Sequence, residues 1–323
     1  MSYSHISNSR MPIHSWLGNP SIDKLALPIC SHKGVVKDLS GTVKFLLKPK
    51  GVLGRGTFGI VEIFDRIDAS TQESRVVAMK RPTHPSIDLY LEALVQKKLH
   101  TELQRYGLHT CIPEVYDIIQ DSRTKDVWFT MEALDPQLLS QWCVRRSYEE
   151  APKVFGLLLL QIALVLQVLE DVLQFDHRDL KVNNILIADT PLSIAMDWKG
   201  ESKTLEFPFR VVFVDFGFSC IGGKVDVRDN SEFPPLDPCP KVGRDMFQVI
   251  VSLWSIHSFR SMIENAWGAW VRERLGRSQY IHLTENSQTL EWMYMVTDVK
   301  EFQAPLCTPF QIIQDCIQAL EGI

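Results

Sequence analysis

The chain has 323 residues, of which 45% are hydrophobic and 23% are charged, and its formal net charge is -5. This composition is typical of a globular protein that can bury a substantial core, and the negative balance gives no support to a general nucleic-acid-binding or polybasic membrane role. The seven cysteines are odd in number and include no Cys-x-x-Cys pair. They therefore predict reduced thiols and no zinc site.

Two stretches bear on targeting and on membrane insertion. Residues 1–20 are polar and lack the apolar core of a secretory signal. The long apolar run at 154–169 is interrupted by Gln161 and Gln167 and is shorter than the roughly 20 residues that a membrane span needs. We therefore expect a buried helix there, in an intracellular protein, cytoplasmic or nuclear, with no membrane span and no direct nucleic-acid binding.

The N-terminal part of the chain contains an extension followed by a β-rich region. Residues 1–42 carry scattered prolines without a sustained hydrophobic period, which predicts a partly irregular extension. From residue 43 onward, short β-type runs between Gly-rich or polar turns predict a small antiparallel sheet. The predicted strands are at 43–47, 60–64, 75–80, 115–119 and 127–131. Leucines at helical spacing predict one helix, at 87–99.

Gly54, Gly56 and Gly59 lie between two of these predicted strands. Glycines have no side chain, so backbone N–H groups can approach a polyphosphate closely at such positions. A glycine-rich turn without a ligand is the alternative. A dinucleotide-binding fingerprint would open a helix, whereas the residues at 60–64 indicate a returning strand. The pattern therefore favours a hairpin that covers phosphates over a Rossmann-type turn.

Lys80 ends an apolar strand segment, 77–80, and a buried ammonium group needs a negatively charged partner. Glu92, on the predicted helix that follows, is the expected partner, and Glu102 is a weaker alternative. The other interpretation of Glu92 is a solvent-exposed helix residue. The sequence thus predicts an ion pair between Lys80 and Glu92.

After residue 135 the predicted elements are mainly helices. Their positions are 137–146, 154 to about 174, 244–259, 260–275, 286–296 and 309–320. A small β-rich region, residues 43–134, thus precedes a larger helical region, residues 135–323. Strands and helices that are segregated in this way are typical of the α+β class.

The stretch 177–184, His-Arg-Asp-Leu-Lys-Val-Asn-Asn, places a carboxylate, a cation and an amide close together. Lys181 lies two positions after Asp179, and its charge can neutralise a phosphoryl group during transfer. Asn184 and Asp215, which follows an apolar run, offer the oxygen ligands that Mg²⁺ prefers. Each residue alone would be an ordinary surface or capping group, but together they predict a phosphoryl-transfer site.

Four motifs in this order resemble the signature set of the eukaryotic-like protein kinase superfamily. They are Gly-x-Gly-x-x-Gly at 54–59, Val-Ala-Met-Lys at 77–80, His-Arg-Asp at 177–179 and Asp-Phe-Gly at 215–217. The resemblance implies a bilobal α+β fold with a small β-rich N-lobe, 43–134, and a larger helical C-lobe, 135–323. It also implies ATP and Mg²⁺ (or Mn²⁺) as cofactors. The residues from Leu180 to Asn184 resemble the Ser/Thr-directed form, which implies a protein substrate with a Ser or Thr acceptor.

The resemblance also implies roles for individual residues. Asp179 would accept or orient the proton of the attacking hydroxyl, Lys181 would neutralise the phosphoryl group, and the pair of Lys80 and Glu92 would orient the phosphates. Asn184 and Asp215 would hold the metal. The residues implied in nucleotide binding are Leu53, Gly54, Arg55, Gly56, Thr57, Phe58, Gly59, Ile60, Val61, Ala78, Lys80, Met131, Glu132, Leu134 and Leu186.

Further positions would belong to the internal framework of a kinase. His177 and Phe216 would stack on one another, together with the residue four positions after Glu92, which is Gln96. A polar residue there departs from the usual apolar one, so either the helix register differs or Gln96 has an extra hydrogen-bond partner. Asp245 resembles the structural aspartate that holds the catalytic loop.

The chain departs from the usual kinase pattern at two places. Residues 185–214 indicate an enlarged hairpin or insertion, centred near 188–209. No Ala-Pro-Glu follows residues 215–217, and the segment 218–244 contains neither Thr nor Tyr. Haspin-like kinases and divergent kinases of large DNA viruses also lack this motif, and a viral member would act in the host cell.

Three functions fit these features. The first is an active Ser/Thr protein kinase. The joint presence of six polar residues favours it, namely Lys80, Glu92, Asp179, Lys181, Asn184 and Asp215. The second is a catalytically weak ATP-binding scaffold, which the unusual segment 218–244 favours. The third is a small-molecule kinase, and Lys181 counts against it because the usual signatures of that class lack this lysine.

Overall fold

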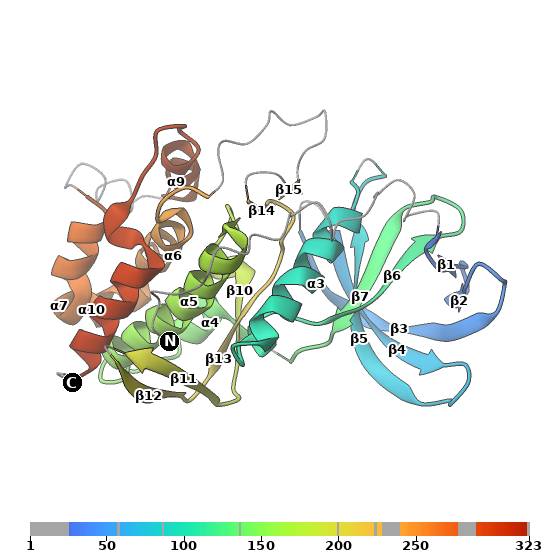
Figure 1. The fold of residues 1–323 in the computed structure, drawn as a ribbon, viewed down its shortest axis with the longest axis horizontal. Coiled ribbons are helices and arrows are strands. Elements are labelled where there is room, and N and C mark those ends of the chain that lie inside the picture. Colours follow the sequence, from blue (N-terminus) through green and yellow to red (C-terminus); the bar gives the residue numbers. More distant parts are fainter. Residues whose placement is uncertain are drawn as a thin grey trace. The chain divides into compact units, whose positions relative to one another are not determined.

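The computed structural model describes residues 26–56, 59–85, 87–135, 137–198, 200–222, 225–227, 240–276 and 289–321. The described residues form two compact units. The small unit comprises residues 26–101 and 112–135, and the large unit comprises residues 102–111 and those from 137 onward. Figure 1 shows β1–β7 in the small unit, and most of the helices in the large unit.

The strands of the small unit form a closed barrel in the order β1-β2-β3-β4-β5-β7-β6. Their bounds are Ile29–Cys30 (β1), Val35–Lys37 (β2), Val43–Arg55 (β3), Gly59–Asp68 (β4), Ser74–Pro82 (β5), Val115–Asp121 (β6) and Val127–Glu132 (β7). Neighbours are antiparallel except β1 and β6, which are parallel. The strands predicted from residue 43 onward are confirmed. β1 and β2 add to the sheet two strands that the sequence did not predict.

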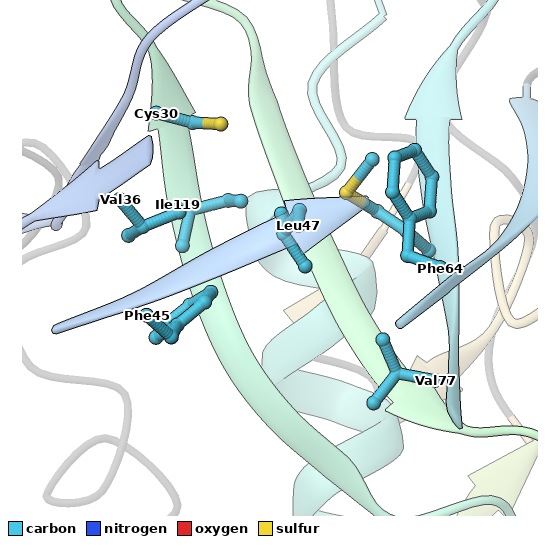
Figure 2. Packing of buried hydrophobic residues seen from close by; sticks show 8 residues of the cluster. Cys30, Val36, Phe45, Leu47, Phe64, Val77 and Ile119 are labelled. Carbon is cyan, nitrogen blue, oxygen red and sulfur yellow. The ribbon is translucent and has the colours of Figure 1, made fainter. Parts of the chain in front are cut away.

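The barrel core contains side chains from six of these strands (Figure 2). Phe45 and Leu47 on β3 are buried at alternate positions, as expected where one face of the strand points inward. On β5 burial is continuous from Val77 to Lys80, and Val77 and Met79 belong to this cluster. The other members of this cluster are Cys30, Val36, Phe64 and Ile119. Because Cys30 and Val36 belong to β1 and β2, the two short strands contribute to the core as well as to the hydrogen bonding of the sheet.

Helix α3, Tyr90–Gln104, is the helix predicted at 87–99, and its residues 90–101 belong to the small unit. Ala93 on α3 packs with Leu89, with Val115 on β6 and with Phe129 on β7. Met131, at the end of β7, is partly buried against the same cluster. The helix is therefore held on the β6–β7 strands by apolar contacts, which fixes the direction of its polar side chains.

The large unit is built around α5, Ala151–Leu173, whose residues are mostly buried. Its other helices are α4 Leu139–Cys143, α6 Arg244–Trp254, α7 His257–Arg274, α9 Thr289–Thr297 and α10 Pro309–Glu321. α5 packs against α7 and α10. By length and apolarity it could also cross a membrane, but 72% of its most apolar window is buried, as in the core helix of a globular unit.

The predicted insertion near 188–209 is an antiparallel hairpin of β11, Leu192–Trp198, and β12, Glu201–Phe207. The hairpin is followed by β13, Arg210–Phe213, which pairs with β10, Ile185–Ala188. Gln161, which interrupts the apolar run of α5, donates from Nε2 to the carbonyl of Phe209 at 3.0 Å and accepts the N–H of Val211. A buried amide thus satisfies two backbone groups beside the hairpin.

The structure differs from two of the helix predictions. Residues 137–138 form the short strand β8, Gln137–Leu138, which pairs with β10, so the helix predicted from 137 begins only at α4. The helix predicted over 244–259 is broken between α6 and α7. The hydroxyl of Ser255 donates to the carbonyl of Ser252 at 2.7 Å, an alternative to continued helical bonding of the kind that serine offers at helix ends.

The cysteines agree only in part with the expectation of reduced thiols. Five are free and buried, namely Cys30, Cys111, Cys143, Cys307 and Cys316. Burial raises the pKa of Cys30 to about 11 and that of Cys111 to about 12, so these thiols stay protonated and unreactive. Cys220 is disulfide-bonded, so the expectation is wrong there. Sequence spacing excludes a Cys-x-x-Cys pair, but it says nothing about cysteines that folding brings together.

Candidate active site

The glycine-rich segment of the small unit is a hairpin between β3 and β4, as predicted. The N–H of Gly56 donates to the carbonyl of Gly59 at 2.8 Å, and the next residue, Ile60, pairs with Arg55. A Cβ at Gly59 would lie 2.6 Å from Cε of Lys80, so a side chain at this position would displace Lys80. Apart from Gly54 itself and its two chain neighbours, no described residue has an atom within 4 Å of the place where a Cβ of Gly54 would be, so packing does not explain that glycine. Thr57 and Phe58 lie outside the described residues.

The predicted ion pair between Lys80 and Glu92 forms in the small unit. Nζ of Lys80 lies 2.5 Å from Oε1 of Glu92, and the two residues are only 6% and 2% exposed. Opposite charges offset the desolvation of a buried pair only when their geometry is good, as it is here. Glu102, the weaker alternative, pairs instead with Arg105 at 3.2 Å.

Gln96 is buried on α3 and has hydrogen-bond partners. Its Nε2 donates to the carbonyl of Pro113 at 2.9 Å and lies 3.5 Å from Sδ of Met131. Because Glu92 on the same helix meets Lys80, the helix register is the one predicted. The polar residue is therefore explained by its hydrogen-bond partner. Gln96 donates to the Pro113 carbonyl, which would lack this donor if the side chain were apolar.

The other predicted nucleotide-binding residues of the small unit lie on neighbouring strands. Ala78 on β5 pairs with Met131 on β7, and Val61 on β4 pairs with Lys80. Ala78 is buried, whereas Leu53 on β3 is exposed. The remaining ones are Glu132 at the end of β7 and Leu134 two residues later. Leu186 lies on β10 of the large unit.

In the large unit, the side chains of Asp179, Lys181 and Asn184 meet as predicted. Nζ of Lys181 donates to Oδ1 of Asp179 at 3.0 Å, and Nδ2 of Asn184 donates to Oδ2 of Asp179 at 2.8 Å. Asn184 Nδ2 also donates to the backbone carbonyl of Asp179 at 2.8 Å. The amide nitrogen is therefore used within the loop, and the amide oxygen is the atom that remains suited to a cation.

Side chains from α6 hold the backbone of this loop. The carboxylate of Asp245 accepts the N–H of His177 at 2.7 Å and that of Arg178 at 2.9 Å. Gln248 accepts the N–H of Leu180 at 3.0 Å and donates to the carbonyl of Arg178 at 2.9 Å. Burial, and after it the negative charge of the neighbouring Asp176, raises the pKa of Asp245 well above its ordinary value. Asp245 is thus structural, as predicted, and Gln248 is a loop anchor that the sequence did not reveal.

The Asp-Phe-Gly segment is tied to the same loop through its backbone. The N–H of Val214 donates to the carbonyl of Asn184 at 3.0 Å, and the carbonyl of Val214 lies 3.2 Å from Nε2 of His177. Arg178 and Asp215 both have positive φ, at 66° and 65°. Non-glycine residues in this conformation are strained and cluster at functional sites.

The predicted stack of His177 and Phe216 is present. The two ring centroids are 5.2 Å apart, and the ring of Phe175 lies 6.4 Å from that of Phe216. Phe216 is fully buried, which gives the adjacent Asp215 a packed anchor. Burial lowers the pKa of His177, which keeps its imidazole neutral.

The structure adds one site residue that sequence reasoning missed. Tyr294 on α9 donates its hydroxyl hydrogen to Oδ1 of Asp179, and its oxygen accepts from Nζ of Lys181 at 2.7 Å. The ammonium also lies 5.3 Å from the centre of the tyrosine ring. Tyr294 is far from the loop in the sequence, in a segment whose pattern predicts only a helix. No local signal could therefore have identified it.

The comparison with known families agrees with this geometry. The family model described as protein kinase domain matches residues 47–226, which is more than half of the chain. The matched range contains the glycine-rich hairpin, the Lys80–Glu92 pair, the loop around Asp179 and the Asp-Phe-Gly segment. A search of curated proteins found no match. On the strength of the family match, the chain belongs to the protein kinase family.

Proposed function

We propose that the chain is a serine/threonine protein kinase of a divergent type, which transfers the γ-phosphoryl group of ATP to a hydroxyl of a protein. The observation that carries this proposal is the cluster of Asp179, Lys181 and Asn184, in which a buried carboxylate is oriented by an ammonium group and an amide. The side chain of Lys181 is 22% exposed, so its charge is also accessible to a substrate.

In the proposed reaction, these groups act on the acceptor hydroxyl and on the γ-phosphoryl group. The acceptor oxygen forms a bond to the γ-phosphorus, the bond between that phosphorus and the bridging oxygen of ADP breaks, and the acceptor proton passes to Asp179. Lys181 stabilises negative charge on the phosphoryl group, and electrostatic stabilisation of this kind is the main contribution that proteins make to phosphoryl transfer.

We assign the ATP-binding roles residue by residue, with the small unit as N-lobe and the large unit as C-lobe. Lys80, held by Glu92, supplies a fixed cation for the phosphates, and Gly54 allows close approach of the backbone. The full set is Leu53, Gly54, Arg55, Gly56, Thr57, Phe58, Gly59, Ile60, Val61, Ala78, Lys80, Met131, Glu132, Leu134 and Leu186. The burial of Ala78 and the open space around Gly54 support this assignment.

The residues present also fit a divalent metal. The amide oxygen of Asn184 and the carboxylate of Asp215 are hard oxygen donors, which suit Mg²⁺ or Mn²⁺. When bound, such an ion neutralises phosphate charge. The protein contributes the orientation of the two ligands, because Asn184 is held by Asp179 and the backbone before Asp215 is held by Asn184 and His177.

The test is transfer of labelled γ-phosphate to a mixed protein panel, with Asp179→Asn beside the wild type. Loss of the carboxylate should lower transfer by about 10²- to 10⁴-fold, the contribution of a general base, while ATP still raises the melting temperature of the variant. Asp189→Asn is the matched control, because Asp189 is exposed and contacts Gln137.

Phosphoamino acid analysis then tests the acceptor. Label on serine or threonine, lost only in Asp179→Asn, supports the proposal. Label on tyrosine alone would contradict the acceptor class. A wild type that binds ATP and labels no protein would contradict the kinase function and favour an ATP-binding scaffold or a small-molecule kinase.

A further inference from the structure

Tyr294 makes three contacts with the proposed catalytic pair in the large unit. The Tyr294 hydroxyl donates a hydrogen bond to Oδ1 of Asp179 and accepts one from Nζ of Lys181 at 2.7 Å. The same Nζ lies 5.3 Å from the centre of the tyrosine ring. Nζ of Lys181 is in turn 3.0 Å from Oδ1 of Asp179. The three polar groups therefore form a closed triangle, in which each group contacts the other two.

Helix α9 is fixed on α6, so the position of Tyr294 is determined by packing. Met293 is fully buried, and the ring of Trp292 lies 6.2 Å from that of Phe247 on α6. A helix held by the two residues that precede Tyr294 cannot rotate freely. The tyrosine side chain is thus presented to the loop by a rigid element.

A second set of contacts ties the end of α9 to the same loop. Thr297 lies three residues after Tyr294, a spacing that places two side chains on one helix face. Its hydroxyl accepts from Nε2 of Gln248 at 3.2 Å, and Gln248 also bonds the backbone of Arg178 and Leu180. Nζ of Lys241 donates to the carbonyl of Thr297 at 2.9 Å. α9 and the loop are therefore braced against each other through Gln248 as well as through Tyr294.

The donors around Asp179 do not use all the lone pairs of its carboxylate. A carboxylate offers about four lone-pair positions, two on each oxygen. Among the described residues, Tyr294 and Lys181 donate to Oδ1, and Asn184 donates once to Oδ2. One position on Oδ2 remains for an acceptor hydroxyl. The tyrosine thus fixes one oxygen of the base while the other stays available.

We propose that Tyr294 is a positioning residue for phosphoryl transfer, which acts by holding the Asp179 carboxylate and the Lys181 ammonium in one arrangement. This inference rests on the proposed kinase function. A lysine ammonium sits on a flexible four-carbon stem, and the hydroxyl and the ring of Tyr294 together restrict it. Because Tyr294 acts through the catalytic pair, its loss changes the chemical step and leaves the affinity for ATP as it was.

The first test is Tyr294→Phe in the full chain, which removes the hydroxyl and keeps the ring. We expect kcat to fall about ten- to hundredfold, the effect of losing hydrogen bonds to charged groups, with an unchanged KM for ATP. Tyr148→Phe is the matched control, since Tyr148 is 67% exposed and its hydroxyl contacts Ser261. An unchanged kcat overturns the inference. An increased kcat also overturns it, because it would mean that the hydroxyl blocks the acceptor position.

A double-mutant cycle tests whether Tyr294 acts through Lys181. In a Lys181→Ala background, Tyr294→Phe should cost clearly less than it does in the wild type, because the two groups act as a unit. Equal fold losses in both backgrounds would contradict a shared role. A purely structural tyrosine would lower the melting temperature without this coupling.

Hydrogen–deuterium exchange separates this inference from the kinase function itself. The backbone amides of residues 179–184 should exchange faster in Tyr294→Phe than in Tyr148→Phe, whether or not the protein transfers phosphate. If exchange is faster in Tyr294→Phe but the wild type transfers no phosphate, the positioning contact is supported and the proposed function is rejected. Equal exchange in the two variants would reject the positioning contact.

Discussion

The two units each contain a lysine–carboxylate pair, but they build it in different ways. In the small unit, Lys80 and Glu92 are both almost fully buried and lie twelve residues apart, on a strand and the following helix. In the large unit, Asp179 and Lys181 lie two residues apart, Lys181 is partly exposed, and the pair is braced by Asn184 and Tyr294.

Because of this difference, we expect the two pairs to contribute to different properties, one mainly to folding stability and the other mainly to catalysis. A buried pair is costly to break because the remaining charge has little access to water. A partly exposed pair within a network loses less stability when one member is removed, because the other donors remain. We therefore expect that substitutions of the buried pair reduce folding stability, and that substitutions of the braced pair reduce catalysis.

The largest expected effect on stability comes from Glu92→Gln. Removal of the charge beside the buried Lys80 ammonium should lower the free energy of unfolding by about 3–5 kcal/mol, measured by urea denaturation. Glu73→Gln is the control, since Glu73 is exposed. If both variants unfold at the same urea concentration, the buried pair does not stabilise the small unit and the contrast between the units fails.

A pH-dependent effect is expected in the large unit. Burial, and to a lesser extent the charges of Asp176 and Asp171, raises the pKa of Glu170 from 4.5 to about 8. Since the folded state then holds a proton that the unfolded state has released, the contribution of Glu170 to stability is greatest below pH 4.5 and is lost as the pH rises toward 8. The slope is at most about 1.4 kcal/mol per pH unit.

Glu170→Gln should flatten this pH dependence, as measured by thermal unfolding between pH 5 and 8 in matched buffers. The comparable change Glu149→Gln, at an exposed position, should leave the slope as it is in the wild type. A variant at Glu170 with the wild-type slope would show that other groups dominate the titration.

The smallest expected effect on stability comes from Lys181→Ala. Asn184 and Tyr294 still donate to Asp179 in this variant, and the lost ammonium is partly exposed, so the free energy of unfolding should change by less than about 1 kcal/mol. Transfer of phosphate should nevertheless fall, which is measured with the same labelled-phosphate assay. A loss of several kcal/mol would place this pair in the same class as Lys80 and Glu92 and remove the contrast.

The parts of the structure that were predicted are those with a local signal. Lys80 and Glu92 lie on adjacent elements with clear strand and helix patterns, and the loop from His177 to Asn184 is contiguous. The parts that were missed depend on long-range packing. Tyr294 and Gln248 reach the loop from α9 and α6, and neither residue type is unusual in a helix. β1 and β2 have two and three residues, which is too short for a recognisable alternation.

The way in which β1 and β2 close the sheet has a consequence for any shortened form of the protein. β1 pairs with Gln120 and Asp121 of β6, and β2 pairs with Val43, Phe45 and Leu46 of β3, so the two short strands cover part of the edges of β3 and β6. A fragment that starts at residue 47, where the family match begins, would lack both short strands and part of β3. Its exposed N–H and C=O groups would be free to pair with those of another molecule. Such a fragment is expected to aggregate, even though it retains every motif residue that defines the family.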